Sequence, residues 1–332
     1  MKKAGISILI VVLAAGGYLW YDYHSQPAEE WRGLPEENRL ISIEQGSSLQ
    51  EISRQLEEEG AIRSRHLFRI YAFITDKQGR LQAGTYRFGP EEDMVSIMEK
   101  ITRGDVAQMS ITIPEGFTFE QIAGRLENRL NVESDDIMRA AEERDWEREY
   151  LPDPDSVQWQ LEGYLYPATY TITYDTGPEE LLTLMLERFE EQWLEEIASS
   201  GTELEVNELV TVASLVEKEG RLSEEKPLIA GVIYNRMEED MKLQIDASVQ
   251  YALEERQSRL LYRDLEVEST YNTYLHEGLP PGPIASPGDN SLQAALSPEE
   301  SDYLFYFARS DGSHVFTETY QEHLEQQRLR DE

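Results

Sequence analysis

The 332-residue sequence contains no cysteine and only five histidines. The absence of cysteine excludes disulfide bonds, thiolate metal sites and a cysteine nucleophile. The scarcity of histidine argues against a histidine-rich metal centre, and no His-Glu-x-x-His pattern occurs. The sequence also lacks a glycine-rich phosphate loop after a strand and a Gly-x-Ser-x-Gly elbow. We therefore expect no metal and no cofactor.

Basic residues are scarce as well, with 30 Lys and Arg against 65 Asp and Glu, which gives a formal net charge of −35. A surface of this sign repels phosphate backbones, so we expect no nucleic-acid partner. Only seven of the basic residues are lysines. Acid-rich, lysine-poor surfaces suit proteins in high salt, where screening weakens carboxylate repulsion. A halophilic source is therefore one hypothesis, and ordinary composition bias is the other.

Long apolar runs are absent after residue 21, but one precedes it. Residues 4–21 form an 18-residue apolar run behind Lys2 and Lys3, long enough to span a bilayer. The lysines favour a cytoplasmic N-terminus and place the remainder outside the cytoplasmic (inner) membrane. A cleaved signal peptide is the alternative, because residues 14–16 are small. We predict an uncleaved single-pass anchor within residues 1–25.

The length suggests about two domains after this anchor. Residues 26–39 are polar and contain proline, which is typical of a linker. An internal repeat follows at residues 41–62 and 111–132, where Ile41-Ser-Ile-Glu-Gln-Gly46 matches Ile111-Thr-Ile-Pro-Glu-Gly116. Each copy reads as a strand, a glycine turn and an amphipathic helix. Such units resemble LysM-type glycan-binding modules, although packing units of this kind are common. We predict a LysM-like region over residues 40–150.

The predicted fold class is α+β, with a mixed α/β catalytic domain over residues 151–332. Between the two repeat copies, helices are predicted at 67–74 and 94–101 and a strand at 84–88. A charged, helical stretch is predicted over 133–150, and a domain boundary near 105 or near 150. In the C-terminal half we predict strands at 162–170 and 303–309 and helices at 181–197, 208–219 and 223–237, the last with a Ser223 cap and Pro227 in its first turn.

Two acidic residues near the end of the 208–219 helix are candidate general acids. At 100° per residue, Glu217 and Glu219 lie on opposite flanks of the apolar stripe, so at most one faces a given cleft. Lys218 is expected to point to solvent. A carboxyl at the rim of an apolar face is partly desolvated, which raises its pKa toward neutrality. Sequence geometry does not choose between the two, and a solvated helix end is the plainer alternative.

A polar and aromatic series in the C-terminal half has the composition of a sugar-binding groove. Amides, hydroxyls and aromatic faces bind sugar hydroxyls, N-acetyl groups and apolar sugar faces. The rigid turn at residues 279–283 would hold such a loop in place. A buried polar turn network is the alternative. The candidate binding residues are Asn235, Gln244, Asp246, Tyr271, Asn272, Thr273, Tyr274 and Pro281. The spacing of His314 and His323 matches no metal motif, which favours structural or surface roles.

The order of these motifs resembles the YceG-like endolytic murein transglycosylases, the MltG family. The resemblance covers nearly the whole chain and is most specific where Tyr271-Asn-Thr-Tyr274 leads into Gly278-Leu-Pro-Pro-Gly-Pro-Ile284. Further matching segments are Glu162-Gly-Tyr-Leu-Tyr-Pro167, Val212-Ala-Ser-Leu-Val-Glu-Lys-Glu219, Val232-Ile-Tyr-Asn-Arg236, Leu243-Gln-Ile-Asp246, Pro287-Gly288 and Gly312-Ser-His-Val-Phe316.

The resemblance implies that Glu219 is the catalytic acid, with Glu217 as a secondary candidate. It implies cleavage of the MurNAc–GlcNAc bond within nascent peptidoglycan strands, which leaves 1,6-anhydroMurNAc ends and terminates glycan elongation. Peptidoglycan synthases of the elongation machinery are the implied partners. Ile245 and Ala247 depart from the family pattern of Thr or Ser followed by Asp-Pro, and Gly220 replaces the usual Thr. The competing hypotheses are a water-using muramidase, a non-catalytic peptidoglycan-binding scaffold and a metal-dependent hydrolase.

Overall fold

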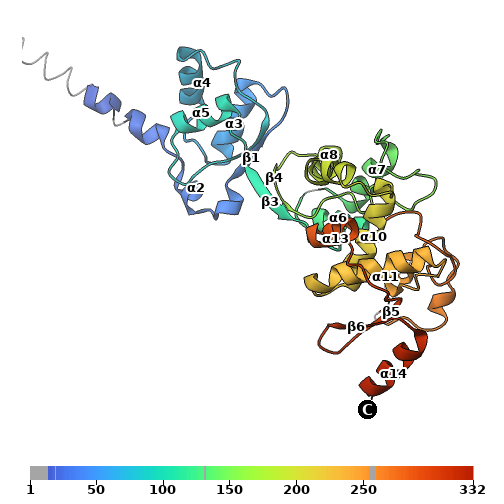
Figure 1. Ribbon diagram of the computed structural model, residues 1–332. Coiled ribbons are helices and arrows are strands. Elements are labelled where there is room, and N and C mark those ends of the chain that lie inside the picture. The colour runs from blue at the N-terminus through green and yellow to red at the C-terminus, as the bar shows by residue number, and fades with distance from the viewer. Residues whose placement is uncertain (1–13, 19, 131, 254–256, 258, 332) are drawn as a thin grey trace, which may run out of the picture. The chain divides into compact units, whose positions relative to one another are not determined.

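The computed structural model describes residues 14–18, 20–130, 132–253, 257 and 259–331. By packing, the chain divides into two compact units (Figure 1). Unit 1 comprises residues 1–110 and Thr171–Thr176, and unit 2 comprises Ile111–Tyr170 and residues 177–332. This division falls near residue 105, the first of the two expected boundaries, so residues 111–150 of the predicted LysM-like region pack with the C-terminal part.

Most of the predicted membrane span, residues 4–13 and 19, lies outside the described residues. Residues 14–18 and 20–25 are helical. Within the described ranges, no helix is both long and apolar enough to cross a bilayer.

Unit 1 packs short helices on a two-stranded antiparallel sheet. In the sheet, β1 pairs with β2 from Leu40 opposite Arg87 to Ile43 opposite Gly84. Three of its helices begin at polar caps, Ser48, Ser64 and Asp93. Ser48 accepts from the amide of Glu51 while the Glu51 carboxylate accepts from the amide of Ser48. The elements are α2 (Glu29–Gly33), η1 (Glu36–Asn38), β1 (Leu40–Ile43), α3 (Leu49–Glu58), α4 (Arg65–Ile74), β2 (Gly84–Arg87) and α5 (Met94–Arg103).

The remaining part of unit 1 comes from far along the chain. Both carboxylate oxygens of Asp175 bind Thr85, one accepting from its amide at 2.7 Å and the other from its hydroxyl at 2.8 Å. Arg87 donates to the hydroxyl of Tyr174 at 2.8 Å. The strands β3 (Gln108–Thr112) and β4 (Thr169–Thr173) pair with each other. Each of them crosses the division between the units.

Unit 2 is built around α10 (Val206–Glu219), which packs against α11, α12 and α13. Residues 209–216 of this helix are all buried, so it is a core helix on every side in its middle turns. The other elements are α6 (Phe119–Glu127), α7 (Ser134–Glu143), α8 (Pro178–Phe189), η2 (Glu190–Leu194), α9 (Glu195–Ser199), η3 (Ser223–Glu225), α11 (Lys226–Glu238), α12 (Asp246–Ala252), η4 (Asp264–Glu266), α13 (Asp289–Leu296), β5 (Phe305–Ala308), β6 (His314–Thr317) and α14 (Tyr320–Asp331).

Several predicted elements are confirmed, and three need correction. The two repeat copies do form strand–helix units, β1–α3 and β3–α6, and the 208–219 helix is α10. The strand predicted at 162–170 is wrong, because residues 161–165 form turns and β4 begins only at Thr169. The Ser223 cap is also wrong, since Ser223 opens the short helix η3 and α11 starts at Lys226, with Pro227 in its first turn. The 181–197 helix contains a π-helical turn, η2.

Candidate active site

Glu219 is the last residue of α10 and lines a cleft of about 440 Å³ in unit 2. Gly220 caps the helix, so Glu219 stands in its last turn, after the fully buried turns 209–216. Three other carboxylic acids share the cleft, from α6, α12 and the turn at 161–165. The lining residues are Thr118, Glu120, Gln121, Gln158, Trp159, Glu162, Lys218, Glu219, Asp246, Ala247, Gln250, Tyr251, Ala252, Leu253 and Ile284.

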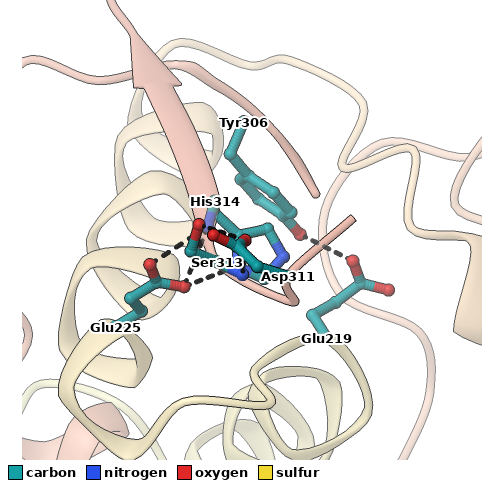
Figure 2. Close-up of polar contacts among 6 residues, drawn as sticks. All are labelled: Glu219, Glu225, Tyr306, Asp311, Ser313 and His314. Atoms are coloured by element: carbon teal, nitrogen blue, oxygen red, sulfur yellow. Dashed lines mark hydrogen bonds and ion pairs between the residues drawn. The ribbon is translucent and has the colours of Figure 1, made fainter. Parts of the chain in front are cut away.

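The environment of Glu219 favours its protonated form. Burial raises its pKa to about 7, and the nearby negative charge of Asp246 acts in the same direction. Three groups oppose this shift: the Tyr306 hydroxyl, His314 and the backbone amide of Ala247. The hydroxyl of Tyr306 donates to Oε2 of Glu219 at 3.2 Å (Figure 2), and His314 exerts a weaker electrostatic effect. A carboxyl balanced between its two protonation states near pH 7 can both give and take a proton.

Asp246 is the first residue of α12, and its negative charge raises the pKa of Glu219. Its Oδ1 accepts a hydrogen bond of 2.6 Å from the hydroxyl of Tyr274. This bond, together with burial, raises the pKa of Tyr274. The sequence grouped Asp246 and Tyr274 in one polar series, and the structure brings them into direct contact beside the candidate acid.

The hairpin of β5 and β6 brings Tyr306 to Glu219, as Figure 2 shows. His314 anchors this hairpin: its ring Nδ1 lies 2.7 Å from Oε2 of Glu225, and its backbone amide donates to both oxygens of the same carboxylate. The Tyr306 ring meets the His314 ring edge-on, with centroids 5.5 Å apart. His314 therefore has a structural role, as the sequence favoured. Tyr306 is not among the residues predicted from the sequence, where the strand-prone run 303–309 is its only signal.

A second buried carboxyl, Glu162, forms the opposite part of the cleft wall. It is 2% exposed, and both of its oxygens accept from the backbone amide of Phe119, at 3.0 and 3.1 Å. Burial raises the pKa of Glu162 to about 8. Beside it, the Trp159 ring packs against Phe119, and Tyr251, whose hydroxyl acts to lower the pKa of Glu162, lines the same cleft. Glu162 stood in a quoted motif but was not predicted as a site residue.

Most of the other predicted binding residues do not line the cleft but form hydrogen bonds to neighbouring loops. Asn235 donates to the carbonyls of Ser301 and Tyr303, and the fully buried Asn272 donates to those of Leu265 and Val267. These bonds fix the loops that lead into the site.

The remaining predicted residues also form contacts within unit 2. The Thr273 hydroxyl accepts from the amide of Ile245, and its carbonyl accepts from the amide of Gln244. Gln244 is exposed and has a left-handed backbone, with φ of 51°. Tyr271 is 5% exposed and packs on Tyr251, and the carbonyl of Pro281 accepts from Asn207. Of the whole predicted set, only Glu219 and Asp246 line the cleft.

Glu217 and Lys218 differ clearly from Glu219 in their surroundings. Glu217 forms an ion pair of 2.9 Å with Lys226 and also accepts from the hydroxyl of Ser291 and the amide of Gly288. It does not line the cleft, so the prediction that only one of the two acids faces a given cleft is confirmed. The prediction that Lys218 points to solvent is wrong. Lys218 is half-buried, lines the cleft and donates to the carbonyl of Gly116, because the 111–116 segment covers this side of α10.

The described residues contain no group of three or more His, Asp or Glu side chains placed to hold a metal ion. The structure is thus a two-unit α+β protein whose larger unit carries a carboxyl-lined cleft. Residues 41–329 match the model of the YceG-like family, and the chain belongs to this family.

The relatives agree with this assignment. The chain is 35% identical over 298 residues to an endolytic murein transglycosylase of Bacillus subtilis, covering 85% of this chain and 82% of that protein. It is 32% identical over 331 residues to an endolytic murein transglycosylase of Streptococcus pneumoniae, covering 91% of this chain and 60% of that longer protein. A crystal structure of a YceG-like protein from Listeria monocytogenes matches with a TM-score of 0.59 and 35% identity, over 86% of this chain and 98% of the other.

Proposed function

We propose that this protein is an endolytic murein transglycosylase in which Glu219 is the catalytic acid and base. The observation that carries the proposal is the half-buried Glu219 side chain in the cleft lining, with a pKa raised to about 7. The names of the relatives support the substrate, which is the glycan strand of peptidoglycan. Of the predicted binding residues, the proposal keeps Asp246 as a substrate contact, because it lines the same cleft.

The proposed reaction needs one carboxyl group in two states. Protonated Glu219 donates to the glycosidic oxygen as the bond between that oxygen and C1 of MurNAc breaks. The 6-hydroxyl of the same MurNAc then attacks C1, and its proton passes to the Glu219 carboxylate. The new O6–C1 bond closes the 1,6-anhydro ring, the enzyme regains its starting protonation state, and no water is consumed. A pKa near 7 makes both transfers accessible at neutral pH.

A water-using muramidase is the second candidate, and the position of Asp246 favours it. Glycosidases that use water need a second carboxyl near the acid. Asp246 is close enough to Glu219 to raise its pKa and is oriented by Tyr274. The products separate the two candidates, since an anhydro end is lighter than a reducing end by one water.

The anchor and the cellular setting belong to the same proposal. We propose that residues 4–21 hold the protein in the cytoplasmic membrane, with the N-terminus inside and both units outside. In this setting the LysM-like region, residues 40–150, is proposed to contact glycan, and peptidoglycan synthases of the elongation machinery are proposed as neighbours.

The test is mass spectrometry of murein sacculi digested with wild-type protein, Glu219→Gln and Glu224→Gln. The last variant removes an exposed acid on η3, five residues away. We expect anhydro-muropeptides from wild type and Glu224→Gln and none from Glu219→Gln, with all three equally folded by circular dichroism. Substantial product from Glu219→Gln would refute its role, and products with reducing ends would favour the muramidase.

A further inference from the structure

One stretch of unit 1 reverses the charge balance of the chain. Residues 63–80 contain a single acidic residue, Asp76, although acids outnumber bases by 65 to 30 overall. The helix α4 lies within this stretch. The five basic residues are Arg63, Arg65, Arg69, Lys77 and Arg80. A basic segment of this kind attracts anionic surfaces that the remainder of the protein repels, even though Arg65 is paired with Glu57 at 3.3 Å.

The same helix exposes large apolar side chains. Ile70 is 56% exposed, and Phe73 and Ile74 are each 75% exposed. At 100° per residue these three lie on one side of α4, whereas Phe68 and Ala72 point into the unit 1 core. Single exposed apolar residues are ordinary, but three neighbours flanked by basic residues are typical of helices that lie in a membrane interface.

The chain that leads to the predicted membrane span runs beside α4. The guanidinium of Arg63, just before α4, stacks over the ring of Tyr23 at 4.1 Å and donates to the carbonyl of Pro27. Tyr71 lies on α4, and its pKa is raised by burial and then by the charge of Tyr21. This helix is therefore close to the last residues of the span.

The connection between the span and the folded unit is short. Trp31, which is 1% exposed, is anchored in the core ten residues after Tyr21. Ten residues reach about 35 Å at most, even when fully extended. Tyr18 and Trp20, near the end of the predicted span, are 67% and 55% exposed, as aromatic side chains at a membrane interface are.

We propose that the exposed side of α4, formed by Arg69, Ile70, Phe73 and Ile74, docks on the outer surface of the membrane together with Lys77, which follows the helix. The occupant is a bilayer leaflet that contains anionic lipids. Its headgroups pair with the basic residues, and its acyl chains cover the apolar ones, which a soluble anionic polymer would leave in water. The inference rests on the membrane anchor proposed above, and it assigns unit 1 a fixed contact at the bilayer.

The absence of cysteine makes a direct test possible. A nitroxide is attached to Phe73→Cys or Ile74→Cys in the full chain, reconstituted in vesicles of phosphatidylcholine and phosphatidylglycerol. Glu58→Cys, exposed at the end of α3, is the control. We expect labels at 73 and 74 to be more accessible to oxygen than to a water-soluble nickel complex, and the reverse at 58. Equal, water-like accessibility at all three positions would overturn the proposal.

Lipid charge and the anchor are tested in the same samples. We expect the label at 74 to become as accessible to the nickel complex as a water-exposed position in the double variant Arg69→Glu, Lys77→Glu. Replacing the anionic lipid by phosphatidylcholine should have the same effect. Spin–spin broadening between labels at 74 would assign this face to a second copy of the chain and overturn the proposal. If the labels are exposed to water but the protein stays on the vesicles during an alkaline wash, docking of α4 is overturned and the anchor stands. If the wash releases the protein, both the anchor and docking are overturned. Murein cleavage measured in detergent reports separately on the catalytic proposal.

Discussion

The hydroxyl of Tyr306 donates a hydrogen bond of 3.2 Å to Oε2 of Glu219, and no other side-chain hydrogen bond to this carboxyl is found among the described residues. Because a phenol stabilises the carboxylate more than the acid, this bond lowers a pKa that burial and Asp246 raise. The strand β5 thus helps set the protonation state of a residue on α10.

Replacing Tyr306 with Phe should move the alkaline limit of activity upward. Loss of the donor raises the pKa of Glu219 above about 7, so the acid stays protonated to higher pH. A hydrogen bond to a charged group corresponds to a shift of about one pH unit. The measurement is the pH profile of kcat/KM for murein cleavage. Tyr303→Phe, which removes a hydroxyl that does not contact Glu219, is the control. An unchanged limit in Tyr306→Phe would contradict the prediction.

The Glu217–Lys226 pair should matter for stability rather than for chemistry. The two side chains are only 10% and 6% exposed, so Glu217→Gln leaves a buried ammonium without its counter-charge. We expect a loss of about 3 kcal/mol in the free energy of unfolding. Activity per folded molecule should fall far less than in Glu219→Gln. Adding Lys226→Met should recover part of the stability in urea unfolding, and a double variant no more stable than the single one would argue against this explanation.

Glu162 should make the protein less stable as the pH rises. Its pKa is about 8 when folded, against an ordinary value near 4.5, so the native state holds a proton that the unfolded state loses between these values. The unfolding free energy should decline by up to about 1.4 kcal/mol per pH unit in this interval. Glu162→Gln should remove this contribution. Urea unfolding from pH 5 to 8 compares the two proteins, and parallel curves would contradict the pKa of Glu162.

Two glycines allow backbone strain to be separated from crowding in unit 2. Gly163 and Gly278 both have left-handed backbones, with φ of 84° and 76°. A Cβ on Gly163 would overlap the Pro283 side chain, whereas one on Gly278 meets open space. We expect Gly278→Ala to cost about 1 kcal/mol and Gly163→Ala about 3 kcal/mol. Thermal unfolding measures both, and similar losses would mean that Pro283 moves aside freely.

Helical periodicity and stop signals predicted several helices of both units, among them α3, α5 and α10, but not α12, α13 or α14. The glycine after 94–101, for instance, marks the left-handed end of α5 at Gly104. The 162–170 segment was misread because its aromatic residues are buried by tertiary packing: Tyr164 bonds Asn207 and meets Phe189 edge-on. Apolar runs of this length do not distinguish a strand from buried turns.

The site was predictable only in part, for a physical reason. Amphipathic geometry placed Glu217 and Glu219 on different flanks of the helix, which agrees with their separate environments. It could not identify Tyr306, Glu162 or Lys218, because their places depend on contacts between segments far apart in the sequence. Tyr306 reaches Glu219 from β5, Glu162 binds the amide of Phe119, and Lys218 binds the carbonyl of Gly116. The hydrogen bonds of Asn235 and Asn272 to loop carbonyls depend on the same long-range folding.

The return of Thr171–Thr176 to unit 1 limits how this protein can be divided or recombined. A gene fusion or a recombination event with one junction near residue 110 would separate Thr85 and Arg87 from Asp175 and Tyr174. Transferring unit 1 intact therefore requires two inserts, and a fragment ending before residue 171 lacks part of its own fold. Inheritance of the two units as one block is the expected evolutionary outcome.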